Sequence, residues 1–340
     1  MKYTKYESFS KGSLPRGCKL CLKGKKAVIF VTGKCSRNCF FCPLSKLRKN
    51  KDISYINERR IFSNKDLIEE IKNSGAKGCS LTGGDPLIKL NRTLNIAKKL
   101  KQKFGKKFHI HIYLSTKLVT ENNLEKLSKY VNEVRFHPDL KKPLEEETKK
   151  IKLASKFWKK NKIGIELPMI SNNSKKIILF LDEIKDYVSF LNLNEFESGE
   201  ISQDYLLKKY TLNSDGYTIK NSIKSGLRLI KIIEKKYPKL KIHLCTARTK
   251  NWHQYRNRLK NYKIPKFFKQ TEEGTNIYFS TKNKNLSKFL IKKDYYFDKS
   301  KNQFILNPKK VFEIKDNLKV YKIEEYPTYD REEVEKEILI

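Results

Sequence analysis

The sequence predicts an α/β protein, with a partial (β/α)6 barrel followed by a small α+β domain. Two observations support this prediction. Between residues 27 and 196, six short segments rich in β-branched residues alternate with segments whose apolar residues recur at helical spacing. Strands separated by single helices are typical of parallel βαβ units with right-handed crossovers. A chain of 340 residues is long enough to form such a barrel as one main domain with appendages.

The expected strands and helices alternate in order along the chain. Strands are expected at residues 27–32, 78–82, 108–115, 133–138, 163–169 and 190–196. Helices are expected at 63–71, at 90–103, from residue 120, at 145–160 and at 174–187. Ser63 is the expected N-cap of the first helix, because Asp66 follows it three residues later.

We expect two flanking parts around this barrel. The expected division is an N-terminal arm with a Cys-x-x-Cys pair at 1–24, the barrel at 25–246 and an accessory domain at 247–340. Further elements are expected as a loop at 199–216, a helix at 222–237, a strand at 239–246, a helix at 248–258 and C-terminal strands at 276–280 and 295–297.

Three cysteines directly after the first expected strand carry the strongest chemical signal. Cys35, Cys39 and Cys42 have C-x3-C-x2-C spacing. Three thiolates on one short loop can bind an iron–sulfur cluster, and such a cluster needs four cysteine ligands when protein alone holds it. The next cysteine, Cys79, is distant, so one iron of the cluster would lack a protein ligand. An unfilled coordination position is where a substrate or cofactor binds. The alternative is a zinc loop or three unrelated thiols, but the spacing fits the paired cysteines of zinc sites poorly.

A glycine pair ends the next expected strand. Gly83 and Gly84 are followed by Asp85 and Pro86. Paired glycines let backbone come close to a ligand, and a neighbouring carboxylate can accept hydrogen bonds from an ammonium group. Alone, this tetrapeptide would be an ordinary turn, but here it lies one βα unit after the cysteine loop.

Together the two motifs resemble the radical S-adenosylmethionine (SAM) superfamily. Phe41 is the aromatic residue that this superfamily places before the third cysteine, and the Gly83–Asp85 segment resembles its GGEP motif, with Asp where Glu is commoner. The resemblance covers residues 25–197, and the flanks weakly resemble an archaeal group related to pyruvate formate-lyase activating enzymes. It implies a [4Fe-4S] cluster on Cys35, Cys39 and Cys42, with SAM bound to the open iron.

The resemblance also implies a reaction and a set of cofactor contacts. The reduced cluster would cleave SAM to methionine and a 5′-deoxyadenosyl radical, which takes a hydrogen atom from the substrate. An electron donor of the flavodoxin or ferredoxin kind is therefore an expected partner. The Gly83–Asp85 segment would hold the amino group of SAM, and Phe41 would lie near the adenine. Because chemistry sits at the carboxyl ends of barrel strands, Ser115 and Asn194 are further expected contacts.

Two other polar residues in the expected strands have two interpretations each. His137 could act on substrate as an acid or base, but a hydrogen-bonded histidine at the barrel rim is the favoured interpretation. Glu166 is flanked by apolar residues, so it either faces the barrel interior as a ligand contact or forms a structural pair.

Three classes of function are open on this basis. The predicted function is a radical SAM enzyme that modifies RNA or a small metabolite. The first alternative is an activating enzyme that installs a radical on a partner protein, and the second is a non-catalytic iron–sulfur protein. The presence of Asp85 beside three cysteines argues against the second alternative, because a pure sensor needs no SAM site.

The formal net charge of +38 raises the question of an RNA partner. Lysines occur in nearly every segment alongside many Asn and Ile residues, and an AT-rich genome would explain this equally well. Residues 248–258, which are basic with interleaved aromatics, are the best local RNA candidate. The favoured alternative is a solvated helix with Trp252 and Tyr255 packed inward.

Composition also bears on location. No apolar run is long enough to cross a membrane, and no apolar segment follows the first residues, so we expect no membrane association and a cytoplasmic location. Seven cysteines, grouped as for metal, agree with a reducing compartment.

A second metal site is a further hypothesis. Cys18 and Cys21 form a Cys-x-x-Cys pair, and His243 and Cys245 could supply two more soft ligands. Topology opposes it, because Cys21 precedes the first barrel strand whereas Cys245 ends a late one. If that late strand is parallel to the others, we expect the two cysteines at opposite ends of the barrel.

Overall fold

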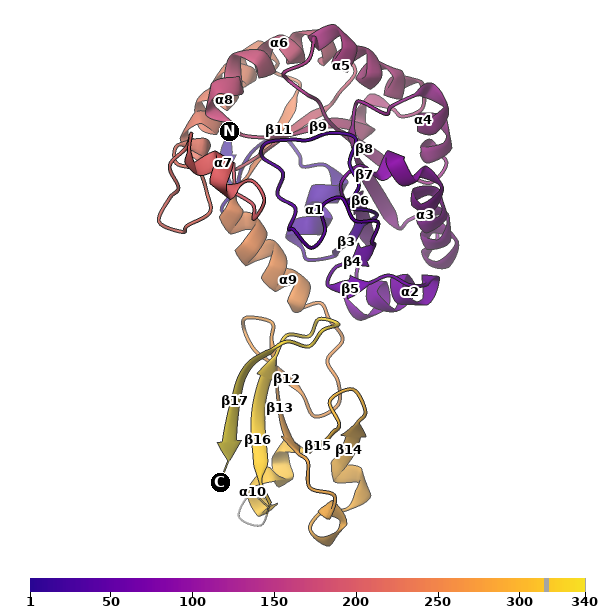
Figure 1. The fold of residues 1–340 in the computed structure, drawn as a ribbon, viewed down its shortest axis with the longest axis vertical. Coiled ribbons are helices and arrows are strands. Elements are labelled where there is room, and N and C mark those ends of the chain that lie inside the picture. Colours follow the sequence, from indigo (N-terminus) through magenta and orange to yellow (C-terminus); the bar gives the residue numbers. More distant parts are fainter. Residues whose placement is uncertain (315–317, 340) are drawn as a thin grey trace.

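The computed structural model describes residues 1–314 and 318–339. Two sheets organise the described chain, and Figure 1 shows them as two parts joined through one helix. The larger part is built on an eleven-stranded sheet, and the smaller part on a six-stranded antiparallel sheet. The predicted fold class is thus confirmed, with an α/β barrel followed by a smaller domain.

The central strands of the larger sheet are all parallel. They are β3 (Lys26–Phe30), β6 (Gly78–Thr82), β7 (His109–Ser115), β8 (Glu133–His137), β9 (Ile163–Pro168), β10 (Phe190–Asn194) and β11 (Lys241–Cys245). The first six are the predicted barrel strands, and β11, which was expected as a further strand at 239–246, extends the run as a seventh. The sheet curls into a barrel that does not close, because its two edges are not paired with each other.

Helices cover the outside of this barrel (Figure 1). They are α2 (Asn64–Asn73), α3 (Leu90–Phe104), α4 (Glu121–Ser128), α5 (Leu144–Lys152), α6 (Ser174–Ile184) and α8 (Ser222–Lys236). Ser63 caps α2 as predicted, in a capping box with Asp66. Two expectations were wrong in detail: α5 ends at Lys152 and gives way to 3-10 turns, and the expected loop at 199–216 contains a short helix, α7 (Gln203–Leu207).

Successive side chains along each strand point alternately out of and into the barrel, which gives the sheet an apolar outer face and a polar inner face. The outward side chains pack with the helices in one continuous core and include Ile29, Leu81, Ile112, Val134, Ile165, Leu191 and Leu244. The side chains between them face inward and include Lys26, Ser80, Tyr113, Arg135, Glu166, Asn192 and His243. An ordinary barrel fills its interior with layers of bulky apolar residues, so this interior is unusual for the fold.

Residues 1–24 contribute to the barrel. Strands β1 (Lys2–Tyr3) and β2 (Phe9–Lys11) extend one edge of the sheet, because β2 pairs antiparallel with β11. At the other edge lie β4 (Tyr55–Ile56) and β5 (Arg59–Arg60). Helix α1 (Arg16–Leu22) lies inside the ring of strands (Figure 1) and contacts β3, β6 and β7. The expected arm is therefore an integral part of this sheet and of its interior.

The C-terminal part is joined to the barrel by a helical segment that begins with a π-turn, Thr249–Gln254, and continues as α9 (Tyr255–Leu259). Its strands are β12 (Lys269–Gln270), β13 (Asn276–Thr281), β14 (Tyr295–Asp298), β15 (Gln303–Leu306), β16 (Val320–Glu325) and β17 (Glu333–Leu339). The short helix α10 (Val311–Ile314) contributes to its core.

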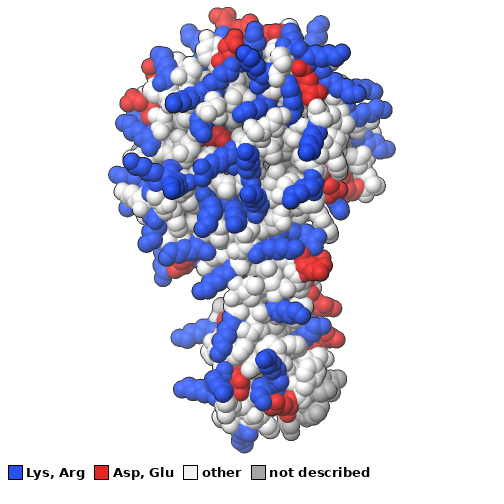
Figure 2. All heavy atoms as spheres, turned by 180° about the vertical axis from the view of Figure 1, so that it is seen from behind, with Lys and Arg blue, Asp and Glu red and all other residues white. Residues whose placement is uncertain are grey.

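Basic side chains are spread over both parts of the face shown in Figure 2, rather than confined to one patch. None of the helices in the described part of the chain is long and apolar enough to cross a membrane.

Candidate functional site

The cysteine loop leaves the carboxyl end of β3, as predicted, and is held by backbone hydrogen bonds. The Gly33 amide donates to the Lys51 carbonyl over 2.8 Å, and the Asn50 amide donates back to Gly33 over 2.9 Å. A Cβ at Gly33 would lie 1.7 Å from the Arg48 carbonyl oxygen, so only glycine allows this approach. The loop is thus closed at its base, and its cysteines lie beyond that closure.

The Gly83–Asp85 segment runs beside the start of the cysteine loop. The Gly84 amide donates to the Thr32 carbonyl over 2.7 Å, and the Asp85 amide donates to the Lys34 carbonyl over 2.9 Å. Gly83 has φ +141°, and a Cβ there would lie 2.4 Å from the Thr32 oxygen. The glycine pair therefore brings the two predicted motifs together through backbone contact.

The Asp85 carboxylate joins three elements. One oxygen accepts hydrogen bonds from the Ser36 hydroxyl over 2.7 Å and the Ser115 hydroxyl over 2.6 Å. The other accepts from the Leu87 amide over 3.0 Å, which caps the following 3-10 turn. Asp85 is fully buried, so an acidic group lies at the carboxyl ends of β6 and β7, directly beneath the cysteine loop. The predicted pair of Asp85 and Ser115 is thus brought together.

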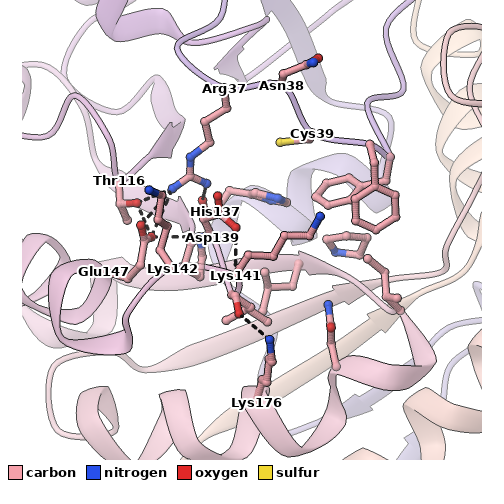
Figure 3. Close-up of a pocket in the computed structure, with 18 of the residues that line it drawn as sticks. Arg37, Asn38, Cys39, Thr116, His137, Asp139, Lys141, Lys142, Glu147 and Lys176 are labelled. Carbon is pink, nitrogen blue, oxygen red and sulfur yellow. Dashed lines mark hydrogen bonds and ion pairs between the residues drawn. The ribbon is translucent and has the colours of Figure 1, made fainter.

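Arg37, between the first two cysteines, ties the loop to the rest of the barrel (Figure 3). Its guanidinium donates to the His137 carbonyl over 2.6 Å and to the Thr116 hydroxyl over 2.5 Å. It also forms an ion pair with Glu147 of α5 over 3.2 Å, with both side chains nearly buried. Arg37 therefore fixes the cysteine loop to the ends of β7 and β8. No sequence pattern indicates this role, because the partners of Arg37 are remote along the chain.

A groove of about 700 Å³ opens beside the cysteine loop, over the ends of β8 and β9. Cys39 and Phe41 lie on one wall, and the Phe41 ring packs on His137 at a centroid distance of 5.6 Å. Burial lowers the pKa of His137 to about 4, and the nearby Arg37 charge adds to this. His137 is therefore a neutral rim residue at pH 7, which agrees with the favoured interpretation.

The three cysteine side chains are the groups that the predicted cluster would bind. Cys35 is exposed and Cys39 and Cys42 are half-buried. Among the described residues, no three His, Cys, Asp or Glu side chains are close enough to share one metal ion. In a cubane cluster each thiolate binds a different iron, so its ligands lie further apart than those of one ion. Burial raises the pKa of Cys39 to about 11, so cluster binding must displace a proton there.

Comparisons with known proteins agree with this geometry. The Radical SAM superfamily model matches residues 29–188. A Methanocaldococcus jannaschii protein, provisionally named as a glycyl-radical enzyme activating enzyme, is 35% identical over 98% of this chain and 94% of its own length. The chain belongs to the radical SAM superfamily. As a radical SAM enzyme it uses a [4Fe-4S] cluster and SAM.

Solved structures give a weaker likeness. Two structures of the radical SAM methyltransferase TsrM from Kitasatospora setae match with a TM-score of 0.38 and 9% identity, over 58% of this chain. One holds tryptophan and a SAM analogue, and the other holds cobalamin and a [4Fe-4S] cluster. The matched region spans less than half of those chains, 42% and 43%, and the likeness carries no functional argument.

The barrel of this radical SAM enzyme encloses a second cavity of about 480 Å³, here called the lumen. Inward side chains from all seven parallel strands line it, from Lys26 on β3 to Cys245 on β11. Asn194, predicted as a cofactor contact, lies here and donates to Glu166 over 2.9 Å. Glu166 also accepts from Arg135 over 3.1 Å. It therefore both faces the interior and forms structural pairs.

Cys21 and Cys245 approach each other, contrary to our expectation. Strand β11 is parallel to β10, yet the Gln254 amide hydrogen-bonds both thiols, at 2.6 Å to Cys21 and 3.5 Å to Cys245. The reason is the position of α1. This helix lies inside the ring of strands and contacts the turn Thr249–Gln254 that follows β11, and Gln254 on that turn reaches both thiols.

The structure nevertheless does not bring the four residues of the second-site hypothesis together around one ion. Cys18 lies apart from the Gln254 amide, and its sulfur accepts hydrogen bonds from Arg135 and Asn192, each over 3.4 Å. The set Cys18, Cys21, His243 and Cys245 does not meet the spacing for a shared ion in the described chain. These thiols are instead part of the lumen wall.

The basic segment 248–258 is held by carboxylates. Arg248 pairs with Glu7 over 3.1 Å, Arg256 with Glu273 over 2.8 Å and Arg258 with Glu58 over 2.5 Å. Trp252 remains 40% exposed between two guanidinium groups, so it does not pack inward. Because its arginines are already neutralised, this helix offers phosphates little free charge.

Proposed function

We propose that this radical SAM enzyme abstracts a hydrogen atom from a small polar molecule bound in the lumen. The observation that carries the proposal is that the inward positions of every parallel strand contribute to a polar cavity. Thr82 and Asn194 line the cavity at strand ends, and Thr82 lies three residues before Asp85. The lumen therefore reaches up to the residues that bridge to the cysteine loop.

The residues around the cysteine loop support separate roles in binding the cluster and the parts of SAM. Cys35, Cys39 and Cys42 would hold the cluster, and Asp85 with Ser115 would receive the amino group of SAM. Phe41 lies on the wall of the neighbouring groove, which has room for the adenosine part of SAM. When bound, the reduced cluster supplies the reductive cleavage of SAM.

The surroundings of the groove also support an electron donor with an acidic docking face. Seven cationic side chains and three carboxylates line it. The cations are Arg37, Lys117, Lys141, Lys142, Lys150, Lys176 and Lys209. A flavodoxin- or ferredoxin-like protein of negative charge would be attracted to this face.

RNA is a less favoured substrate, because the segment 248–258 forms internal ion pairs and the remaining basic residues are dispersed (Figure 2). A partner protein is the second candidate. What favours it is the relative's name, since the two chains align over almost their whole lengths.

One experiment separates these candidates. The enzyme, reconstituted without oxygen and supplied with SAM and dithionite, is incubated with fractions of a lysate from cells grown in deuterated medium. Deuterium in 5′-deoxyadenosine that requires the low-molecular-mass fraction supports a metabolite substrate. Deuterium that requires the protein fraction, with a glycyl radical signal by electron paramagnetic resonance, would replace that proposal with the activating-enzyme function.

A further inference from the structure

Among the described residues, the lumen contains positive charge that no carboxylate neutralises. Its lining includes five cationic side chains, Lys26, Arg48, Arg135, Lys250 and Arg258, and two carboxylates, Glu58 and Glu166. Three of the cations are paired: Arg258 with Glu58, Lys250 with Glu197, and Arg135 with Glu133 and Glu166.

Two cations, Arg48 and Lys26, remain without a carboxylate among the described residues. Arg48 lies over the rings of Phe30 and Tyr55, whereas Lys26 has no such contact. In residues 1–314 and 318–339, no hydrogen bond or ion pair to its ammonium group is formed, although it lies beside Cys18, Cys21 and Tyr113. Burial raises the pKa of both Cys18 and Tyr113, so neither provides an anion at neutral pH. A charge taken out of water without a counter-ion is costly, and this one lies where a ligand can reach it.

Two buried polar atoms across the barrel also lack partners within the described chain. They are the Asn192 side-chain oxygen and His243 Nε2, on side chains that are 1% and 2% exposed. The two residues are neighbours in the register of β10 and β11 and both line the lumen. The Asn192 amide nitrogen already donates to Glu166 over 2.8 Å, so its free oxygen accepts only from something else. Buried groups of this kind are normally satisfied, and leaving them unpaired is destabilising.

The geometry points to a binding site for a small anion that also carries a hydrogen-bond donor. We propose that a carboxylate or phosphate pairs with Lys26 while a hydroxyl or amino group of the same molecule donates to Asn192, beside His243. A volume of about 480 Å³ accommodates a metabolite of this kind. This inference rests on the proposed function in one respect: it takes the bound molecule to be the substrate of the enzyme. The binding itself requires neither SAM nor the cluster.

Direct binding tests the site without catalysis. Full-length reconstituted enzyme is titrated calorimetrically with glycerol 3-phosphate, malate and serine, and with glycerol as the uncharged control. We expect at least one anionic probe to bind, and Lys26→Met to weaken its binding about tenfold or more, the usual effect of losing a charge-assisted hydrogen bond. Lys26→Arg should retain binding, and Lys23→Met, which removes an exposed lysine nearby, should not change it. Comparison of the dissociation constants of glycerol 3-phosphate and malate shows whether the site prefers a phosphate or a carboxylate.

Alkylation of Cys21 locates the probe. Because the cluster protects the loop cysteines, maleimide labelling read by mass spectrometry reports on the lumen, and a bound probe should slow the labelling of Cys21. The inference is overturned if no anionic probe binds, if Lys26→Met binds as well as the wild type, or if binding leaves Cys21 labelling unchanged. Normal SAM cleavage alongside such a result would leave the radical function intact, whereas probe binding without SAM cleavage would sustain the site and refute the function.

Discussion

Replacing Asp85 with Asn tests the assignment of the SAM amino group. The substitution keeps the size and removes the charge. The Leu87 amide donates to one oxygen of Asp85, so the Asn oxygen should keep that position and its NH₂ should face Ser36 and Ser115. Both hydroxyls can rotate to accept instead of donate. We therefore expect a loss of unfolding free energy of about 1 kcal/mol or less.

SAM binding should respond much more strongly. An ammonium group bound by a buried carboxylate gains a charge-assisted hydrogen bond, and losing it costs about 1–3 kcal/mol, or roughly 5- to 150-fold in Kd. Equilibrium dialysis of SAM against reconstituted protein measures this, with iron content and the cluster absorption as checks on loading. Asp186→Asn, at an exposed residue on the loop after α6, is the matched control. An unchanged Kd for Asp85→Asn, at equal iron content, would refute the reasoning.

Three further changes have distinct expected outcomes. Cys39→Ala should abolish SAM cleavage and lower bound iron, because the cluster then loses a protein ligand, and full cleavage by this variant would contradict the cluster assignment. Arg37→Met should lower the unfolding free energy by about 3 kcal/mol, because it leaves the Glu147 carboxylate buried and unpaired. The same variant should lose iron to a chelator faster than the wild type. An unfolding free energy equal to that of the wild type would show that the ion pair contributes nothing. Burial lowers the pKa of His243 to about 4 from 6.5, so only the unfolded chain takes up its proton between these values, and stability should fall by up to about 3 kcal/mol as pH drops through this range. Urea unfolding at pH 7 and pH 5 should show a smaller drop for His243→Gln, and equal drops would rule out this histidine as the cause.

Local patterns in the sequence were enough to predict the barrel and its cofactor site. The apolar strands and capped helices appear where periodicity placed them, because these signals depend on neighbours in the chain. The cysteine loop and the Gly83–Asp85 segment meet because the ends of adjacent parallel strands share one edge. The partners of Arg37 could not be predicted in this way, since Thr116, His137 and Glu147 approach it only through the tertiary fold.

The position of Cys21 shows where strand-by-strand reasoning failed. Treating the strands as a flat sheet put the start of β3 and the end of β11 at opposite ends. In the structure, α1 lies inside the ring of strands and contacts the turn after β11, and the Gln254 amide reaches both Cys21 and Cys245. Strand topology alone therefore does not place a residue that lies outside the strands, such as Cys21 on α1.

The sequence contains a signal of the polar lumen. A parallel strand covered on both faces reads as a continuous apolar run, yet several of these strands alternate polar and apolar residues. Arg135 follows Glu133 by two residues, and Asn194 follows Asn192 in the same way. In a parallel barrel this period of two leaves only one face for the apolar core, so the other face must be satisfied by internal pairs or by a ligand. Among the described residues that line the lumen, Lys26 and the free atoms of Asn192 and His243 lack such a partner, and groups of this kind are what distinguishes a binding site from a polar core.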